Sequence, residues 1–218
     1  MLAMLSLSVV LFAQLAQPVR EIECEEAVFR GDAQSALRAG HAMLAQAETV
    51  EAHRCLARAN NMLRNLPASA YHCEAAIHLR SNDPITLRIY AMVLNDQGRY
   101  HAAASAAAES VRLDPNDYES QFTLGVSLHN TKNLDGALDA FAAALAGEAH
   151  EIRRGSHGPT DAATPRCLSF AANPQNADAL KWQGHSLREQ PGGVQNAIVS
   201  YERALALRPD DADLLMNV

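Results

Sequence analysis

The sequence predicts an all-α protein built as a solenoid of antiparallel helix pairs. Its composition favours helices, because alanine is abundant, only 5% of the residues are aromatic, and Val, Ile and Thr are sparse. A period of 34 residues runs through most of the chain, and each period holds two helix-length segments separated by a tight turn. Proline-containing stretches at 113–116 and 207–210 end two of these periods, where proline stops a helix.

The first segment, residues 1–16, is almost wholly apolar. Two interpretations stay open for it: a signal peptide, or a buried first helix of the array. No basic residue precedes the apolar run and no A-x-A site follows it, which favours the buried helix.

The rest of the chain divides into repeat units with small residues at fixed positions. Counting from residue 50, position 8 is Ala57, Ala91, Gly125 and Gly184, and positions 20 and 27 are also small throughout. Small side chains at these positions let the two helices of a pair approach closely. The predicted units are 17–49, which is degenerate, then 50–83, 84–117, 118–146 completed by 172–176, 177–211, and the start of a truncated repeat at 212–218.

Residues 147–171 interrupt the period. Removing them restores the register, so they are an insertion, and their Gly, Pro, Ser and Thr content predicts disorder. Two alternatives stay open: a functional loop on the rim of the solenoid, or a translated intron, because the residues at both ends of the segment can be encoded by splice-site sequences.

The sequence lacks the common motifs of catalytic, phosphate-binding and metal-binding sites. It has no phosphate-binding glycine loop, HExxH, GxSxG or paired CxxC, so we expect no enzyme activity, no cofactor and no metal. The formal charge of −7, with no run of Lys and Arg, argues against nucleic acid as a partner. The four scattered cysteines predict buried thiols and no disulfide framework.

The small residues at positions 8, 20 and 27, the aromatic residues Phe141 and Tyr201, and the terminal prolines together resemble the tetratricopeptide-repeat (TPR) family. The resemblance implies a right-handed superhelical solenoid that acts as a scaffold or adaptor. Such a protein binds peptide segments of other proteins in its concave groove. We therefore expect protein partners, no small-molecule substrate, an unlikely membrane association, and a cytoplasmic location unless residues 1–16 are a signal peptide.

The family's groove positions define a candidate site on the first helices of the units. It consists of Arg54, Arg58, Arg88, Met92, Asn95, Phe122, Val126, His129, Lys181, His185 and Arg188. Two specialised roles are disfavoured. The carboxylate clamp of chaperone-binding domains retains its arginines, but Ile89, Glu119 and Thr123 depart from it, and the asparagine ladder of O-linked N-acetylglucosamine transferases is missing. An alternative remains that the chain is the repeat fragment of a larger glycosyltransferase of that kind.

Overall fold

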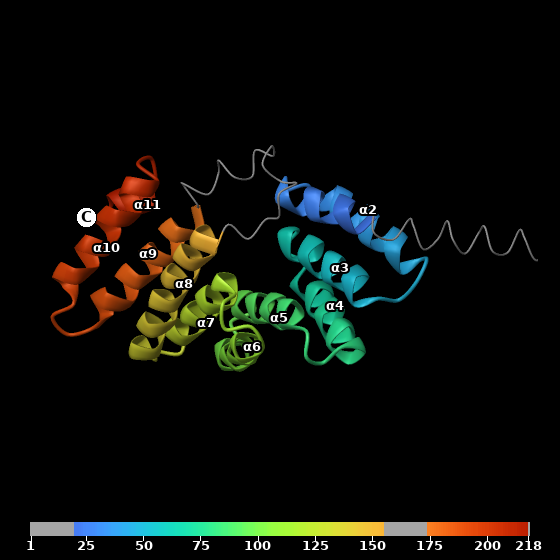
Figure 1. Cartoon of the computed structure of the whole chain (residues 1–218), viewed down its shortest axis with the longest axis horizontal. Coiled ribbons are helices and arrows are strands. Elements are labelled where there is room, and N and C mark those ends of the chain that lie inside the picture. The colour runs from blue at the N-terminus through green and yellow to red at the C-terminus, as the bar shows by residue number, and fades with distance from the viewer. Residues whose placement is uncertain (1–19, 155–173, 218) are drawn as a thin grey trace, which may run out of the picture. The chain divides into compact units, whose positions relative to one another are not determined.

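The computed structural model describes residues 20–154 and 174–217, and this part of the chain contains helices and turns but no strand (Figure 1). The predicted all-α fold class is therefore confirmed. The chain divides into two compact units, residues 1–99 and 100–218, which are described separately below. Residues 1–16 and most of the insertion, from 155 to 171, lie outside the described residues.

Unit 1 contains a first helix over residues 20–29 and four further helices. These are α2 (Ala33–Leu44), α3 (Val50–Met62), α4 (Leu66–Leu79) and α5 (Pro84–Asp96). Consecutive helices pack on one another, and α3 also contacts α5. Side-chain caps set where several of them begin: Asp32 accepts a hydrogen bond from the Ser35 amide, and Thr49 accepts one from the Ala52 amide.

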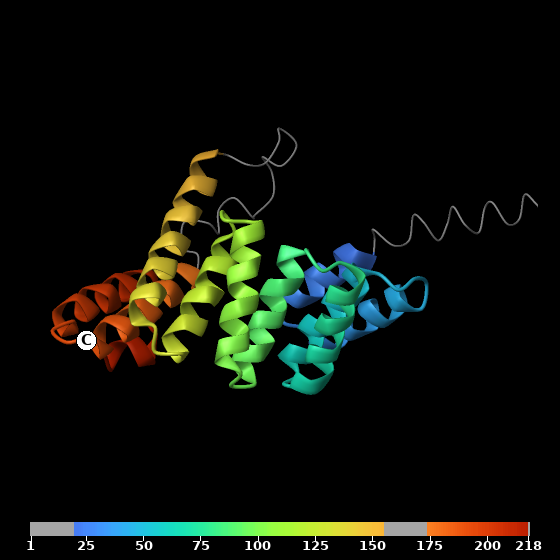
Figure 2. The ribbon, with the colours of Figure 1, turned by 90° about the horizontal axis from the view of Figure 1, so that it is seen from below.

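Unit 2 contains the remaining six labelled helices. These are α6 (Tyr100–Leu113), α7 (Tyr118–Asn130), α8 (Leu134–Arg154), α9 (Pro174–Glu189), α10 (Val194–Leu207) and the short α11 (Ala212–Leu215). The strongest packing joins α7 to α8 and α9 to α10, as antiparallel pairs, and α7 also contacts α9. Helix α8 continues to Arg154, past residue 146 where the repeat was expected to break, and Figure 2 shows its additional length.

The turns inside the helix pairs share one conformation. Each places a residue in the left-handed region at the same repeat position: Gly31 (φ 75°), Arg64 (59°), Gly98 (74°), Lys132 (65°) and Gly192 (75°). In four of them the following amide closes the turn on a carbonyl five residues back, at 2.8–2.9 Å: Asp32 on Ala27, Asn65 on Asn60, Arg99 on Leu94, and Asn133 on Leu128. This hydrogen bond is the mark of a Schellman-type helix end.

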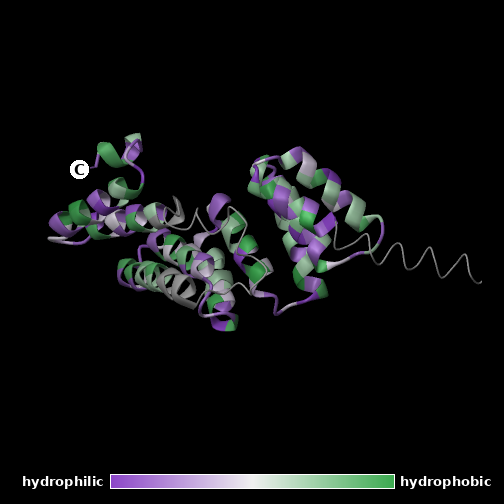
Figure 3. Cartoon of the chain, turned by 45° about the horizontal axis from the view of Figure 1, so that its top comes forward, coloured by the Kyte–Doolittle hydropathy of each residue, from purple (hydrophilic) through white to green (hydrophobic). Residues whose placement is uncertain are grey.

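The small residues at position 8 make room for aromatic rings in unit 2. A Cβ added to Gly125 would lie 2.5 Å from the Phe141 ring, and one added to Gly184 would overlap the Tyr201 ring in the same way. Both rings are fully buried. In Figure 3 the helices contain both hydrophobic and hydrophilic residues, as helices that are buried on one side require.

The prediction that the cysteines are thiols is wrong for two of them. Cys24 in the first helix and Cys55 in α3 form a disulfide, with their Cα atoms 6.1 Å apart. The two positions are 31 residues apart, close to one period, so successive repeats place them opposite each other. The sequence prediction considered only the number and spacing of the cysteines, not their positions within the repeat, and so it missed this disulfide. Cys73 is a buried free thiol, as predicted.

Candidate functional site

The predicted groove residues all lie on the first helices of their pairs. Arg54 and Arg58 are on α3, Arg88, Met92 and Asn95 on α5, Phe122, Val126 and His129 on α7, and Lys181, His185 and Arg188 on α9. The residues of α3 and α5 belong to unit 1, and those of α7 and α9 belong to unit 2. The candidate residues are therefore described as two groups, one in each unit.

In unit 1, the two α3 arginines are ion-paired with acidic residues of the same chain. Arg58 Nη1 lies 2.6 Å from Glu25 Oε2. Arg54 lies 3.8 Å from Glu21 and 3.4 Å from Asp83, and only 15% of its side chain is exposed. Both glutamates come from the first helix, so that helix supplies carboxylate partners to both arginines.

On α5, the apolar part of the candidate site is exposed. Met92 is 45% exposed and Ile85, one of the family's groove positions, is 40% exposed. Arg88 and Asn95 are half-buried on the same helix. An exposed methionine on a binding helix can adapt to different apolar side chains.

In unit 2, four rings from three helices form what we call the aromatic row: His129 of α7, Trp182 and His185 of α9, and Tyr201 of α10. Trp182 lies edge-to-face between the two imidazoles, with ring centroids 5.2 Å from His129 and 5.6 Å from His185. The His185 and Tyr201 centroids are 5.5 Å apart. Edge-to-face geometry stabilises neighbouring rings and holds them in position.

Hydrogen bonds fix both imidazoles of the aromatic row. His129 Nδ1 is 3.0 Å from Ser186 Oγ, which donates to the Trp182 carbonyl and therefore accepts from the imidazole. The Tyr201 hydroxyl is 3.0 Å from His185 Nδ1. Burial lowers the pKa of both histidines, although the Glu189 carboxylate opposes this for His129. Both rings are therefore neutral at pH 7.

Charged side chains around the aromatic row are also held in place. Lys181 Nζ lies 3.0 Å from Asp213 and 3.8 Å from Asp211. Glu189 pairs with Lys132 at 2.8 Å, and this lysine lowers the pKa of the carboxyl. The exposed Arg188 donates to the Asn217 side chain at 2.5 Å. Phe122 packs near Phe141, with centroids 6.0 Å apart, and Val126 is half-buried.

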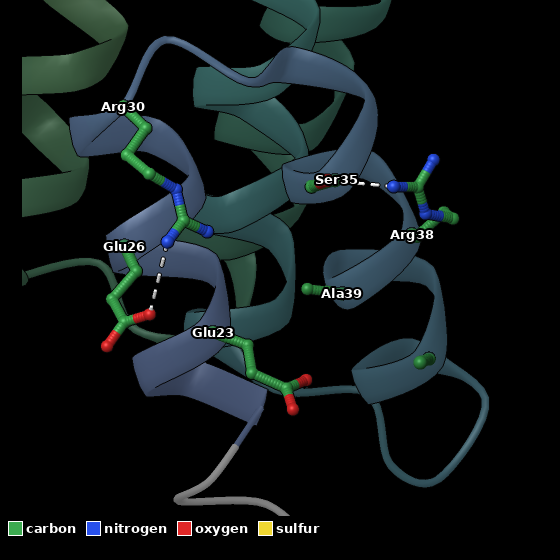
Figure 4. Close-up of a pocket in the computed structure, with 7 residues that line it drawn as sticks. Glu23, Glu26, Arg30, Ser35, Arg38 and Ala39 are labelled. Atoms are coloured by element: carbon green, nitrogen blue, oxygen red, sulfur yellow. Dashed lines mark hydrogen bonds and ion pairs between the residues drawn. The ribbon is translucent and has the colours of Figure 1, made fainter.

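A separate cavity of about 390 Å³ lies between the first helix and α2 (Figure 4). Its lining residues are Glu23, Glu26, Arg30, Ser35, Arg38, Ala39 and Ala42. Arg30 pairs with Glu26 at 3.6 Å, and Arg38 donates to Ser35 Oγ at 2.8 Å. The lining carries two carboxylates and two guanidinium groups, so the cavity has no net charge to attract an ion.

Sequence reasoning missed the partners of the arginines and the centre of the aromatic row. Positions 5 and 9 of the degenerate repeat at 17–49 are Glu21 and Glu25, so applying the groove positions to that unit gives both carboxylates. Trp182 lies at position 6, outside the groove positions that we considered. The one sequence feature that could have pointed to Trp182 is that it is the single tryptophan of the chain.

The described residues contain no cluster of three or more His, Cys, Asp or Glu side chains suited to a metal ion. None of the described helices combines the length and apolar character needed to span a bilayer.

Comparisons with known proteins agree with this architecture. Residues 91–152 match the family model described as tetratricopeptide repeat. No curated protein matches the sequence.

Several solved structures resemble the chain over most of its length. TTC0263, a thermophilic TPR protein from Thermus thermophilus, matches with a TM-score of 0.68 and 15% identity, covering 92% of this chain and 95% of that one. MamA from Desulfovibrio magneticus gives a TM-score of 0.61 and 16% identity, covering 90% and 97%. YrrB, described as a TPR protein with an unusual peptide-binding site, gives 0.60 and 18%, covering 88% and 87%.

At these identities the structural likeness concerns the fold. Together with the packed helix pairs, it shows that this chain has the fold of tetratricopeptide-repeat proteins, and residues 91–152 also match the repeat by sequence.

Proposed function

We propose that this protein is a non-enzymatic scaffold that binds a peptide segment of another protein on the α7–α9 face of unit 2. The observation that carries the proposal is the aromatic row, with Trp182 held between two neutral imidazoles. The remaining candidate residues of this face, Phe122, Val126, Lys181 and Arg188, surround it on the same two helices.

Unit 1 is the weaker candidate for the primary site. Its arginines already have carboxylate partners, so an acidic ligand would have to displace Glu21 and Glu25. Met92, Ile85 and the half-buried Arg88 and Asn95 of α5 could contribute secondary contacts. For this reason we place the primary site on α7 and α9.

The chemistry of the face defines the ligand. His129 and Tyr201 are buried, so the half-buried Trp182 and His185 rings and Val126 are the groups that suit an aromatic or branched apolar side chain, inserted from an extended segment or a short helix. The exposed Arg188 suits a carboxylate beside that anchor. We expect neither nucleic acid nor a small molecule, because the chain carries a formal charge of −7 and the described face holds no converging catalytic groups.

The single tryptophan gives a direct test, because intrinsic fluorescence excited in the indole band reports Trp182 alone. Peptides selected from a displayed random library against the wild-type chain should change this fluorescence on titration. Val126→Glu and Arg188→Glu should each weaken binding at least about tenfold, equivalent to about 1.4 kcal/mol.

Two substitutions on α10 serve as matched controls. Arg203→Glu reverses the same charge at an exposed position, and Val199→Glu places the same carboxylate at an exposed valine. Both should leave the affinity unchanged. Selected peptides that bind the Val126→Glu and Arg188→Glu variants as tightly as the wild type would move the site away from α7 and α9.

A further inference from the structure

Few large apolar side chains pack between the first helix and its neighbours. The cluster that joins it to α2 and α3 consists of small side chains and the two cysteines: Cys24, Ala27, Ala36, Ala39, Cys55 and Ala59, with Val28 and Leu37 at its edge. The two largest apolar residues of the helix, Phe29 and Ile22, are 87% and 59% exposed and add little to this packing. Small side chains bury little area, so the cluster supplies little of the free energy of docking.

Polar contacts add only modestly to this docking. The Glu25–Arg58 pair is partly exposed on both sides, and the Glu21–Arg54 contact is long at 3.8 Å. A partly exposed pair contributes little to stability, and so does an ion pair as long as the Glu21–Arg54 contact. Arg20 donates to the Ala42 carbonyl at 2.7 Å, which ties the start of the helix to α2. A helix of about ten residues is not stable in isolation, so its order depends on what attaches it.

We propose that the Cys24–Cys55 disulfide is the covalent attachment that keeps the terminal repeat, residues 20–44, docked on α3, and that the protein works in a compartment that oxidises thiols. Both sulfurs belong to buried residues, 2% and 3% exposed, at the centre of the cluster. The bond joins the helices between the Glu21–Arg54 and Glu25–Arg58 pairs. It therefore fixes the position of both carboxylates over the arginines.

The chemistry is thiol–disulfide exchange. In formation, the thiols of Cys24 and Cys55 give two electrons and two protons to an external disulfide of the glutathione type, which becomes two thiols. In reduction, an external thiolate attacks one sulfur, the Sγ–Sγ bond breaks, and the released cysteine thiolate takes up a proton. A second external thiol then resolves the mixed disulfide.

The third described cysteine does not readily replace either partner. Cys73 is 1% exposed, and burial raises the pKa of its thiol to about 12, so it forms almost no thiolate at neutral pH. Cys167 lies outside the described residues.

The disulfide also indicates the cellular compartment in which the protein works. Disulfides persist in oxidising compartments and are rare in the cytosol. The proposal therefore selects the secreted or lumenal alternative over the cytoplasmic location expected from the sequence.

The first part of the test is peptide mapping of the whole chain, refolded in a buffer of reduced and oxidised glutathione and alkylated without reduction. Trypsin cleavage at arginine and lysine places the four cysteines in four different peptides, and those of Cys24 and Cys55 cover residues 21–30 and 55–58. The expected product is these two peptides joined by a disulfide. Free thiols at both positions, or pairing with Cys73 or Cys167, would overturn the proposal.

The second part measures hydrogen exchange of the full chain before and after treatment with dithiothreitol. Exchange of the amides of residues 20–44 should accelerate at least about tenfold on reduction, and α9 and α10 should serve as unchanged internal references. Double substitution, Cys24→Ala with Cys55→Ala, should reproduce the reduced pattern without any reductant. Equal exchange in the oxidised and reduced chains would show that the bond is not needed for docking and would overturn the proposal.

This outcome is independent of the proposed peptide site, because the fluorescence of Trp182 reports unit 2. If the terminal repeat opens on reduction but the fluorescence of Trp182 responds to no selected peptide, the result supports the proposed role of the disulfide and refutes the proposed function.

Discussion

The position of one ring decides how closely two helices of unit 2 can approach. The Phe141 side chain is fully buried and lies directly over Gly125, closer than any Cβ could tolerate. Tyr201 occupies the same place over Gly184 in the next pair. Both glycines lie inside helices, so their backbone conformation does not require glycine. The close approach of the aromatic ring requires it instead.

Replacing Gly125 should therefore be costly. Gly125→Leu should lower the free energy of unfolding by at least about 1–3 kcal/mol, because the new side chain displaces the Phe141 ring from a packed core. Chemical denaturation followed by circular dichroism measures the change. Ala142→Leu adds the same side chain next to Phe141 at an exposed position and should change stability little. Equal behaviour of the two variants would contradict this packing.

A second residue-scale feature is the contact between two imidazoles of unit 1. His53 Nδ1 lies 3.0 Å from His72 Nδ1, and His53 Nε2 lies 3.3 Å from Glu48 Oε1. Burial, and then the nearby His53 and His41, lower the pKa of His72 to about 4. The contact needs one unprotonated nitrogen to accept, so protonating both rings removes it.

This lowered pKa makes stability depend on pH. His72 is less readily protonated in the folded chain than in the unfolded chain, where its pKa is near 6.5. Its contribution is present above about pH 6.5 and should be lost as the pH falls toward 4. Because the ring is half-buried, the slope should stay below about 1.4 kcal/mol per pH unit. Urea titrations at several pH values should show a flatter profile for His72→Leu, and parallel profiles would refute the assignment.

At the scale of the element, each helix pair depends on one left-handed turn residue. Gly98 closes the turn after α5 with φ of 74°, and no atom lies within 4 Å of where its Cβ would be. Arg64 and Lys132 adopt the same conformation in other pairs, so the turn accepts a side chain at some cost.

Gly98→Ala isolates that cost, because open space excludes a clash. We expect a loss of about 1 kcal/mol in the free energy of unfolding, from backbone conformation alone. Thermal or urea unfolding measures it. Ala108→Gly, at an exposed position inside α6, provides a reference for a glycine exchange governed by helix propensity. A neutral Gly98→Ala variant would show that the turn can relax out of the left-handed region.

At the scale of the whole molecule, stability in a repeat array is a sum over neighbours, because each repeat contacts only the next. In unit 2 the last contributor is Leu214 of α11, which is fully buried against Leu180, Tyr201 and Ala204. Its neighbour Leu215 is 59% exposed. The two leucines therefore form a natural pair for testing how far a local defect spreads.

Leu214→Ala should destabilise unit 2 by about 2–5 kcal/mol, as expected for a large-to-small change in a core. Leu215→Ala should have an effect below about 0.5 kcal/mol. Hydrogen exchange in residues 20–99 should be the same in both variants. Faster exchange there in Leu214→Ala alone would mean that the whole chain unfolds as one cooperative unit.

Sequence alone was sufficient for the helix pairs and the small residues between them, because the 34-residue period repeats the same packing problem several times. The sequence did not predict the contacts that join the first helix of one repeat to the first helix of the next. The Arg58–Glu25 pair and the Cys24–Cys55 bond join different repeats, one of them degenerate, so neither follows from the pattern of a single unit. The aromatic row was missed for a similar reason, since its rings come from three helices.

The disulfide also has a topological consequence for a damaged chain. It closes a covalent loop from residue 24 to residue 55, and residues 45–48, between α2 and α3, are exposed within that loop. A single proteolytic cut after Glu48 would break the backbone there, yet the two fragments would remain one molecule until a reductant separated them. A nicked protein would therefore migrate at full length on a non-reducing gel and as two bands on a reducing one.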